Sequence, residues 1–267
     1  MRIAFIGGGV MGEAMIKGVL AKGVASPQDI TVSDVIKERL SALSQSYGIR
    51  TSASNRQALD GSEVAVIAVK PQNLAQLMPE LEGLFTPGQL VLSIVAGAGI
   101  ATLTQGLRHG AVVRAMPNTP AQIGEGMSVW TASSEVSQGQ REKARSILGA
   151  LGLEIYVADE GYLDMATAIS GSGPAYIFLV MEALNHAAEV IGLPREMAKE
   201  LVSQTVLGAA RLARETGRDP KELREMVTSP GGTTAKAISE LEEGGLRALF
   251  DRAVRAAYER AKELGRK

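Results

Sequence analysis

The chain has 267 residues, of which 45% are hydrophobic and 21% charged, and its net charge is −1 at pH 7. It carries no basic stripe interleaved with aromatic residues and no apolar run of membrane-spanning length, so we expect neither a nucleic-acid nor a membrane partner. It has no cysteine, and its two histidines, His109 and His186, lie far apart without a carboxylate cluster, so we predict no metal site.

Strand-like and helix-like segments alternate over the first 159 residues, which is the pattern of a parallel sheet covered by helices. The first strand begins at Ile3, so we expect no signal peptide and predict a cytoplasmic protein. The predicted strands are residues 3–6, 30–33, 64–69, 90–95, 112–115, 127–131 and 154–157. The predicted helices between them include residues 10–22, 36–47, 73–81 and 137–151.

A glycine-rich loop joins the first predicted strand to the first predicted helix. Gly7, Gly9 and Gly12 satisfy the pattern G-x-G-x-x-G in the strand–loop–helix context that the motif requires. Gly7 allows a tight turn, Gly9 lets the backbone approach a pyrophosphate, and Gly12 lets helix and strand pack closely. Glycine-rich loops also serve as plain turns, but this context favours dinucleotide binding.

The residue after the second strand bears on the choice of cofactor. Asp34 lies 22 residues beyond Gly12 (34 − 12), where an acid binds a ribose diol and repels a 2′-phosphate. Ser33, Lys37, Arg39 and Asn55 offer the opposite possibility, because they would bind that phosphate. The sequence leaves the choice between NADPH and NADH open.

Small and polar residues follow the later strands, at the edge where ligands bind in an open parallel sheet. These segments are Ala68-Val69-Lys70-Pro71, Ala96-Gly97 and Met116-Pro117-Asn118-Thr119-Pro120. Lys70 would reach phosphate or ribose, and Asn118 would hydrogen-bond a nicotinamide amide or a substrate. A solvated lysine beside a proline turn is equally common, and an asparagine in a turn often serves only its own backbone.

From Glu160 onward the sequence predicts helices only, at residues 163–169, 174–191, 194–215, 220–226, 233–241 and 246–264. We therefore predict an α/β Rossmann-type N-terminal domain over residues 1–159 and an all-α C-terminal domain over residues 160–267. The segment from Ala175 to Met181 is apolar on nearly all sides and must be covered. Either a partner subunit or a deep monomeric core would cover it, and both remain open.

Two polar segments in the helical region are candidates for substrate binding. Residues 228–234 read Thr-Ser-Pro-Gly-Gly-Thr-Thr where one predicted helix stops and the next starts. Hydroxyls, glycines and a helix N-terminus together suit a carboxylate or phosphate, although an ordinary turn with a threonine N-cap is the alternative. Residues 170–173 suit a helix N-cap formed by Ser172 and also a second polar wall of a site, and both can hold at once.

The segments 7–12, 68–71, 116–120, 170–176 and 223–234 together closely resemble pyrroline-5-carboxylate reductases, in the same order and spacing over essentially the whole chain. The resemblance implies the reduction of 1-pyrroline-5-carboxylate to L-proline with NADPH or NADH, the last step of proline biosynthesis. It also implies that the helical domain is a dimerisation domain, so we expect a homodimer. Larger rings of dimers occur in that family.

The resemblance also assigns residues. Those expected at the cofactor are Gly7, Gly9, Val10, Met11, Gly12, Ser33, Asp34, Asn55, Ala68, Val69, Lys70, Pro71, Ala96, Gly97 and Asn118. Those expected at the substrate are Glu160, Ser229, Gly232, Thr233 and Thr234, and our hypothesis makes Thr234 the catalytic group at the imine nitrogen. Asp34 departs from a firm NADPH pattern, and Met226 stands where some relatives carry a polar residue that touches the cofactor.

Two other functions are weighed against this interpretation. A β-hydroxyacid or imine dehydrogenase would share the two-domain architecture, but the hydroxyacid enzymes resemble each other in a catalytic lysine on a long helix of the second domain. No lysine lies between Pro174 and Arg195. A non-catalytic nucleotide sensor has no evident need for the hydroxyl cluster at residues 228–234.

Overall fold

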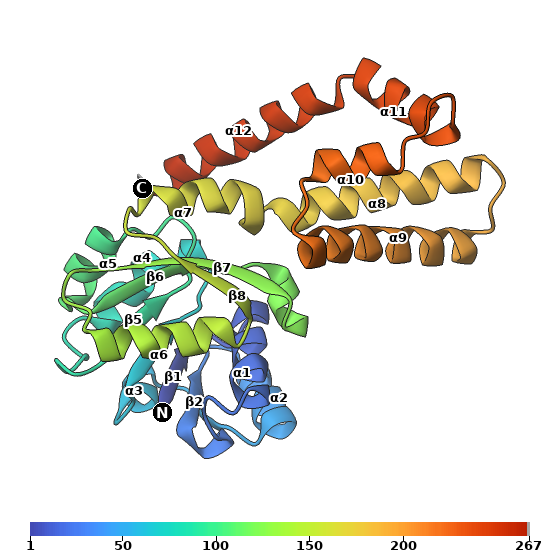
Figure 1. The fold of residues 1–267 in the computed structure, drawn as a ribbon. Coiled ribbons are helices and arrows are strands. Elements are labelled where there is room, and N and C mark those ends of the chain that lie inside the picture. Colours follow the sequence, from blue (N-terminus) through green and yellow to red (C-terminus); the bar gives the residue numbers. More distant parts are fainter. Residues whose placement is uncertain (266–267) are drawn as a thin grey trace. The chain divides into compact units, whose positions relative to one another are not determined.

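The computed structural model describes residues 1–265, and the chain divides into two compact units (Figure 1). Unit 1 contains Met1–Ser172 together with the chain from Ala257 onward, and unit 2 contains Gly173–Ala256. Residues 266 and 267, the end of the predicted helical domain, lie outside the described residues.

Unit 1 is an α/β structure. Its strands are β1 (Ile3–Ile6), β2 (Ile30–Ser33), β3 (Arg50–Ser52), β4 (Val64–Ile67), β5 (Leu90–Ser93), β6 (Val112–Met116), β7 (Gly126–Ala132) and β8 (Gly152–Tyr156). Its helices are α1 (Val10–Ala21), α2 (Lys37–Tyr47), α3 (Asn55–Leu59), α4 (Pro71–Leu81), α5 (Ile100–Leu107), α6 (Gln138–Gly149) and α7 (Gly161–Ala166). Short helical turns are η1 (Pro27–Asp29), η2 (Thr119–Ile123) and the π-helical η3 (Thr167–Gly171).

The strands form a single sheet in the order β3-β2-β1-β4-β5-β6-β7-β8. The predicted parallel sheet has one antiparallel pair, because β7 runs antiparallel to β6 and β8 then runs parallel to β7. A parallel neighbour needs a long crossover connection, whereas β6 returns to β7 through the short turn η2. The predicted Rossmann-type fold is otherwise confirmed.

Alternate residues of β1, β4, β5 and β6 serve two cores, one on each face of the sheet. Ile3 and Phe5 face the core that contains side chains of α1, α2 and α6, whereas Ala4 and Ile6 face the core that contains side chains of α3, α4 and α5. These four central strands are therefore buried on both faces, as their nearly continuous apolar runs indicate. Ligands can reach such a sheet only at its strand ends, which places the candidate cofactor site there.

β1 lies between β2 and β4, where the strand order reverses direction along the chain. Ile6 is in register with Ser33 of β2 and with Ile67 of β4. The residues that follow these three strands, beginning with Gly7, Asp34 and Ala68, therefore meet at one point of the sheet edge. Dinucleotides bind at such a switch point.

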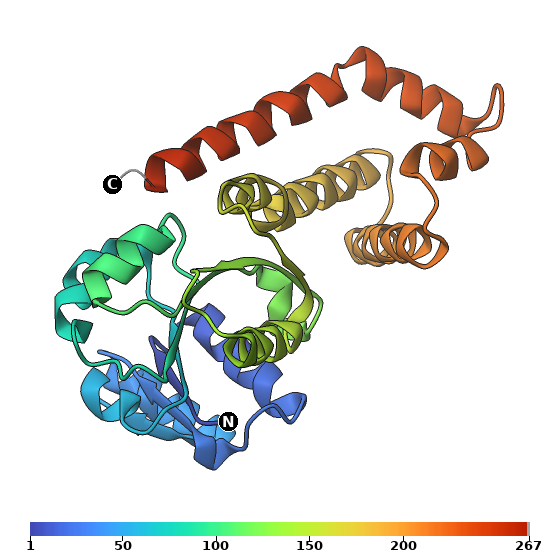
Figure 2. The ribbon, with the colours of Figure 1, turned by 60° about the vertical axis from the view of Figure 1, so that its left-hand side comes forward.

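Unit 2 consists of helices joined by short loops, without a strand among its described residues. It contains α8 (Gly173–Val190), α9 (Arg195–Thr216), α10 (Pro220–Met226), α11 (Thr233–Glu243) and most of α12 (Leu246–Gly265), whose last residues from Ala257 belong to unit 1. These helices confirm the predicted ones, with ends shifted by two residues at most. Helices α8 and α9 pack on each other as a hairpin, drawn in yellow and orange in Figure 2.

The apolar helix α8 has no buried residue within the chain. Phe178 and Leu179 are 56% and 65% exposed, and further apolar side chains of α9 and α12 are exposed as well, among them Leu201 and Leu249. The alternative of a deep monomeric core around α8 is therefore wrong. Soluble monomers rarely expose apolar side chains in such numbers on one set of helices, so another polypeptide is expected to cover them.

Candidate active site

The glycine loop after β1 has the geometry that a bound pyrophosphate requires. Gly7 has φ +102°, and a Cβ atom there would lie 2.8 Å from the carbonyl oxygen of Ala68. A Cβ on Gly12 would lie 2.5 Å from the carbonyl oxygen of Gly7. By contrast, a Cβ on Gly9 would meet no atom within 4 Å, and no side chain caps α1, whose N-cap residue is Gly9. Open space and free backbone N–H groups thus meet at Gly9, which suits a phosphate.

Asp34 is tied to the glycine loop itself. Its carboxylate accepts hydrogen bonds from the backbone N–H of Gly8 at 2.8 Å and of Ile36 at 2.9 Å. Ser33 is buried and donates to Asn55 Oδ1 at 2.7 Å, while Asn55 donates to Glu80 at 3.1 Å. The structure therefore brings the three residues predicted at the adenine ribose to one end of β2.

Of the two cations considered for a 2′-phosphate, one is committed elsewhere. Arg39 donates to the carbonyl oxygen of Gly8 and to the carboxylate of Glu13, both at 2.5 Å, and Tyr47 donates to Glu13 at 2.9 Å. The hydrogen bond from Arg39 is the main cause that holds the pKa of Glu13 below its ordinary value. Lys37 is exposed in the first turn of α2. Arg39 thus stabilises the glycine loop through Gly8 and Glu13 and is already engaged by these partners.

The loops after β4 and β5 also reach this edge. Lys70 is exposed and is the N-cap residue of α4, which begins at Pro71. Gly97 has φ +78°, and a Cβ there would lie 2.9 Å from atoms of Leu264 near the end of α12. Ala96 and Gly97 are half-buried. Only glycine fits at position 97, because both its backbone angle and its neighbour exclude a side chain.

Both ends of the Asn118 side-chain amide are hydrogen-bonded within the protein. Its Nδ2 donates to the carbonyl oxygen of Ser170 at 3.0 Å, and its Oδ1 accepts from the N–H of Met127 at 2.8 Å. Its predicted contact with nicotinamide or substrate stays a prediction. The proposed N-cap at Ser172 is wrong, because Ser172 has helical backbone angles and its N–H donates to the carbonyl oxygen of Thr167 at 2.8 Å, at the end of the π-helical η3.

Glu160 forms a charged cluster with Arg114, a residue that the sequence reasoning missed. Arg114 lies on β6, is only 7% exposed, and donates to Glu160 Oε1 at 2.9 Å and to Asp164 Oδ1 at 3.1 Å. Glu160 Oε1 also accepts from the N–H of Ile100 at 2.9 Å. A charged residue within an otherwise apolar strand is the signal that points to Arg114, since burying a guanidinium requires partners.

The segment between α10 and α11 confirms the expected helix–turn–helix arrangement. Gly231 has φ +68°, and the N–H of Gly232 donates to the carbonyl oxygen of Ser229 at 3.0 Å. α11 begins at Thr233 without a side-chain cap, so the alternative of a threonine N-cap is wrong. Ser229 and Thr233 are exposed and Thr234 is half-buried. Three hydroxyls therefore lie next to free backbone N–H groups at the positive end of a helix dipole.

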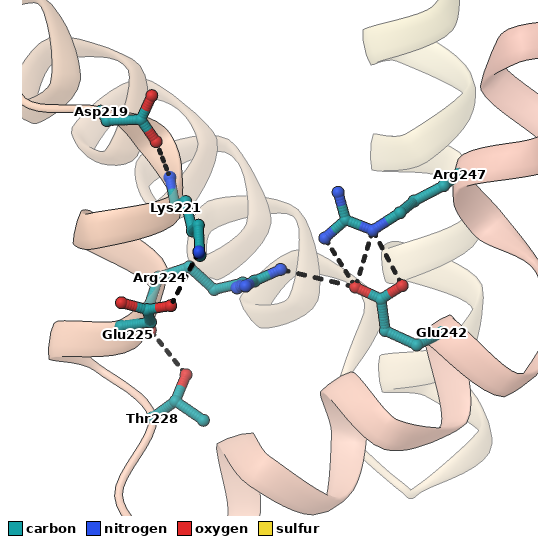
Figure 3. A network of polar contacts seen from close by, with 7 residues as sticks. All are labelled: Asp219, Lys221, Arg224, Glu225, Thr228, Glu242 and Arg247. Atoms are coloured by element: carbon teal, nitrogen blue, oxygen red, sulfur yellow. Dashed lines mark hydrogen bonds and ion pairs between the residues drawn. The ribbon is translucent and has the colours of Figure 1, made fainter.

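Ionic contacts hold the two helices on either side of this segment (Figure 3). Glu242, near the end of α11, pairs with Arg224 of α10 at 3.4 Å and with Arg247 of α12 at 2.7 Å. The hydrogen bond from Arg247 is the first cause that lowers the pKa of Glu242. Thr228 donates to the carbonyl oxygen of Arg224 at 2.6 Å, so its hydroxyl serves its own helix end rather than a ligand.

The predicted site residues thus fall into two groups. All the predicted cofactor residues belong to unit 1, and most of them lie around the switch point. Ser229, Gly232, Thr233 and Thr234 belong to unit 2, whereas Glu160 belongs to unit 1. Among the described residues there is no cluster of potential metal ligands, and none of the described helices is long and apolar enough to cross a membrane.

Fold and site together define a nicotinamide-dependent oxidoreductase with a Rossmann-type domain and a helical domain. Family comparisons agree with this class. The model of the family described as NADP oxidoreductase coenzyme F420-dependent matches residues 2–97, and that of pyrroline-5-carboxylate reductase dimerisation matches residues 160–264.

Relatives that match the whole chain identify the family more specifically than these two partial matches do. A pyrroline-5-carboxylate reductase of Synechocystis is 42% identical over 100% of this chain and 99% of its own. The structure of a pyrroline-5-carboxylate reductase from Coxiella burnetii has a TM-score of 0.89 at 43% identity, covering 98% of both chains. That of the Plasmodium falciparum enzyme, with NADP bound, has a TM-score of 0.90 at 28% identity, covering 99% of this chain and 98% of its own.

The chain belongs to the pyrroline-5-carboxylate reductase family, the enzymes that reduce 1-pyrroline-5-carboxylate to L-proline with NAD(P)H. The predicted family, enzyme class and cofactor type are thereby confirmed, and the hydroxyacid dehydrogenase and the nucleotide sensor are set aside.

Proposed function

We propose that this chain reduces 1-pyrroline-5-carboxylate to L-proline with NADPH or NADH bound at the glycine-loop edge of unit 1. In this proposal Ser229, Gly232, Thr233 and Thr234 of unit 2 bind the substrate. The observation that carries the proposal is the uncapped start of α11 at Thr233, with hydroxyl groups on both sides of it. Family membership supplies the substrate class that such an anion site would take.

The substrate carboxylate would be held at the start of α11. The first N–H groups of a helix have no partner within it and point outward along its axis, and the helix dipole favours negative charge there. Gly232 brings the backbone close to such a ligand because it carries no side chain. The Ser229 hydroxyl lies on the same turn and adds a donor. Neutral donors suffice for a carboxylate when several of them converge.

Reduction of the imine needs a hydride at its carbon and a proton at its nitrogen. The reduced nicotinamide, when bound, supplies the hydride. We assign the nitrogen to Thr234, whose hydroxyl would orient the ring and hydrogen-bond the nitrogen as it becomes an amine. A protonated imine accepts hydride far more readily than a neutral one, so no histidine or lysine acid is required. Catalysis would then rest mainly on positioning.

The residues at the glycine-loop edge would bind the three parts of a dinucleotide in three separate sets. The pyrophosphate would lie at Gly7, Gly9, Val10, Met11 and Gly12, where the space beside Gly9 and the uncapped α1 support its placement. Ser33, Asp34 and Asn55 would line the adenine ribose. The nicotinamide half would lie along a third set, Ala68, Val69, Lys70, Pro71, Ala96, Gly97 and Asn118.

We also propose that residues 1–159 form the cofactor domain and that residues 160–267 form a helical domain that joins two copies of the chain. The exposed apolar side chains of α8 and the match to a dimerisation family support a homodimer. The role of Glu160 at the substrate, larger rings of dimers, the absence of a nucleic-acid partner and the cytoplasmic location stay predictions.

Substitution of Thr234 tests the assigned chemistry. Thr234→Ala should lower kcat/KM for the pyrroline by about tenfold or more, because it removes one hydrogen bond that costs on the order of 1–3 kcal/mol to lose. Thr234→Ser should recover most of the loss. Thr205→Ala is the matched control, since the Thr205 hydroxyl donates to the carbonyl of Leu201 on an exposed stretch of α9. Unchanged kinetics in Thr234→Ala would remove Thr234 from the mechanism.

A further inference from the structure

Arg114 is a buried cation whose two side-chain partners come from one short segment, residues 160–164. It lies on β6, between Ser93 of β5 and Thr131 of β7. Its side chain is only 9% exposed and pairs with Glu160 and Asp164. These two acids are four residues apart at the start of α7, so they lie on one face of that helix. Because the guanidinium is buried, loss of these two contacts would leave an uncompensated charge inside the protein.

Glu160 also holds the start of α5. Its Oε1 atom accepts hydrogen bonds both from Arg114 Nη1 and from the N–H of Ile100, each at 2.9 Å. Gly99, the N-cap residue of α5, offers no side-chain cap of its own. Glu160 therefore caps α5 although it is distant from α5 in the sequence. Its negative charge suits the positive end of the helix dipole.

The backbone between β5 and α5 is consequently held at two points. At one end, Glu160 binds Ile100, and a Cβ on Gly99 would lie 3.6 Å from the same Oε1 atom. In the middle, Gly97 lies against the backbone of Leu264. This segment, residues 94–99, leaves the carboxyl end of β5 beside β4, where open parallel sheets bind ligands.

We propose that Arg114 and Glu160 are positioning residues for the cofactor. Arg114 fixes the Glu160 carboxylate, and Glu160 fixes the start of α5, so that Ala96 and Gly97 keep the conformation that receives the nicotinamide half. The inference rests on the proposed placement of the cofactor. It assigns Glu160 an action through Ile100, in place of direct contact with the substrate.

Glu160→Gln is the direct test, because it removes the charge at the α5 cap while keeping a side chain of nearly equal size. The Kd for NADPH, measured by fluorescence without substrate, should rise about tenfold, the size expected for a lost charge-assisted cap. Hydrogen exchange at the Ile100 amide should accelerate. The KM for the pyrroline, measured at saturating NADPH, should not change.

Two further variants sharpen the result. Asp164→Asn is the matched control, because Asp164 binds Arg114 but has no bond to α5, so its Kd for NADPH should stay near that of the wild type. Glu160→Asp keeps the charge, and should bind NADPH more tightly than Glu160→Gln does.

Three results would overturn the proposal. One is an unchanged Kd for NADPH with unchanged exchange at Ile100 in Glu160→Gln. Another is a raised KM for the pyrroline with an unchanged Kd for NADPH, which would make Glu160 a substrate ligand. The third is an equal loss of NADPH binding in Asp164→Asn, which would indicate a general structural role. Binding and exchange need no substrate, so they stay informative even if the wild-type enzyme fails to reduce the pyrroline.

Discussion

A Cβ atom on Gly232 would lie 2.5 Å from the hydroxyl oxygen of Ser229. The backbone of Gly232 is extended, with φ −78° and ψ 169°, so its angles permit alanine, which is opposed chiefly by that hydroxyl and less by the Ser229 carbonyl oxygen at 3.2 Å. The two residues therefore share one small space at the start of α11. A side chain at position 232 can enter it only by displacing the Ser229 hydroxyl.

Gly232→Ala should therefore impair substrate binding without unfolding the protein. The displaced Ser229 hydroxyl would cost about one hydrogen bond to the carboxylate, so the KM for the pyrroline should rise about tenfold or more. Steady-state kinetics at saturating NADPH measures this, and the Kd for NADPH should not change. Gly139→Ala, at an exposed position of α6 where a Cβ meets no atom within 4 Å, is the control. A normal KM in Gly232→Ala would take Ser229 out of the substrate site.

Gly7→Ala should lower the stability of the fold, whereas Gly9→Ala should weaken the binding of NADPH. Gly7→Ala forces a Cβ against the carbonyl of Ala68 at a positive φ, so the free energy of unfolding should fall by about 1–3 kcal/mol. Gly9→Ala meets open space and should fold normally, but the Kd for NADPH should rise at least about tenfold, because the Cβ occupies the pyrophosphate position. Urea unfolding and fluorescence titration separate the two effects. Tight NADPH binding by Gly9→Ala would contradict the placement of the pyrophosphate.

Phe178→Glu should break the proposed dimer. Phe178 is 56% exposed on α8, and a charge there would be buried against the partner copy, raising the dimer Kd by on the order of 100-fold. Sedimentation analysis of dilute protein should show monomers. Ile123→Glu, at a 76% exposed position of η2 in unit 1, should leave the dimer intact. If Phe178→Glu sediments as the wild type does, α8 is not the dimer surface.

Glu63 should stabilise unit 1 in a pH-dependent way. Lys143 donates to its carboxylate at 2.6 Å and the N–H of Arg2 donates at 3.0 Å, and the hydrogen bond from Lys143 is the first cause that lowers the pKa of Glu63 from 4.5 to about 2. A lowered pKa in the folded state stabilises the fold above about pH 4.5, and this contribution is lost as the pH falls to about 2. The pair is more than one third exposed, so solvent screening limits the contribution to about 1 kcal/mol or less.

Glu63→Gln should accordingly lower the free energy of unfolding at pH 7, and the difference from the wild type should shrink between about pH 4.5 and pH 2. Urea unfolding at several pH values measures it. Glu38→Gln, an exposed substitution on α2, should show no such pH dependence. A constant difference across that range would mean that Glu63 contributes by packing rather than by its charge.

Much of this fold could be predicted from the sequence, because buried parallel strands are continuous apolar runs. Val64–Ile67 and Leu90–Ser93 are examples, and both are buried throughout. Arg50–Ser52 was missed because this edge strand is polar and short, without an apolar signal. The antiparallel direction of β7 was missed as well, because apolar periodicity does not encode strand direction. The helix starts at Val10 and Thr233 were predicted at the residues where the structure places them, although their cap residues Gly9 and Gly232 carry no side chains.

The candidate site was predicted where short motifs carry it and missed where distant residues combine. Gly7, Gly9 and Gly12 lie within one loop, so their geometry follows from local sequence. Arg114 and Glu160 are 46 residues apart and meet only because β6 and the start of α7 are neighbours in the fold. The bond from Asn118 to the carbonyl oxygen of Ser170, 52 residues away, is equally non-local. Such contacts depend on tertiary packing, which local patterns do not specify.

The central claim is that this chain reduces the imine of 1-pyrroline-5-carboxylate, and the reaction of the wild-type enzyme tests it most directly. Purified protein would be mixed with NADPH, or with NADH, and either 1-pyrroline-5-carboxylate or a β-hydroxyacid with the oxidised cofactor. Absorbance would follow the cofactor, and chromatography would identify the product. We predict cofactor oxidation with the pyrroline, L-proline formed in equal amount, and no turnover of the hydroxyacid. Oxidation without proline, or faster turnover of the hydroxyacid, would contradict the account.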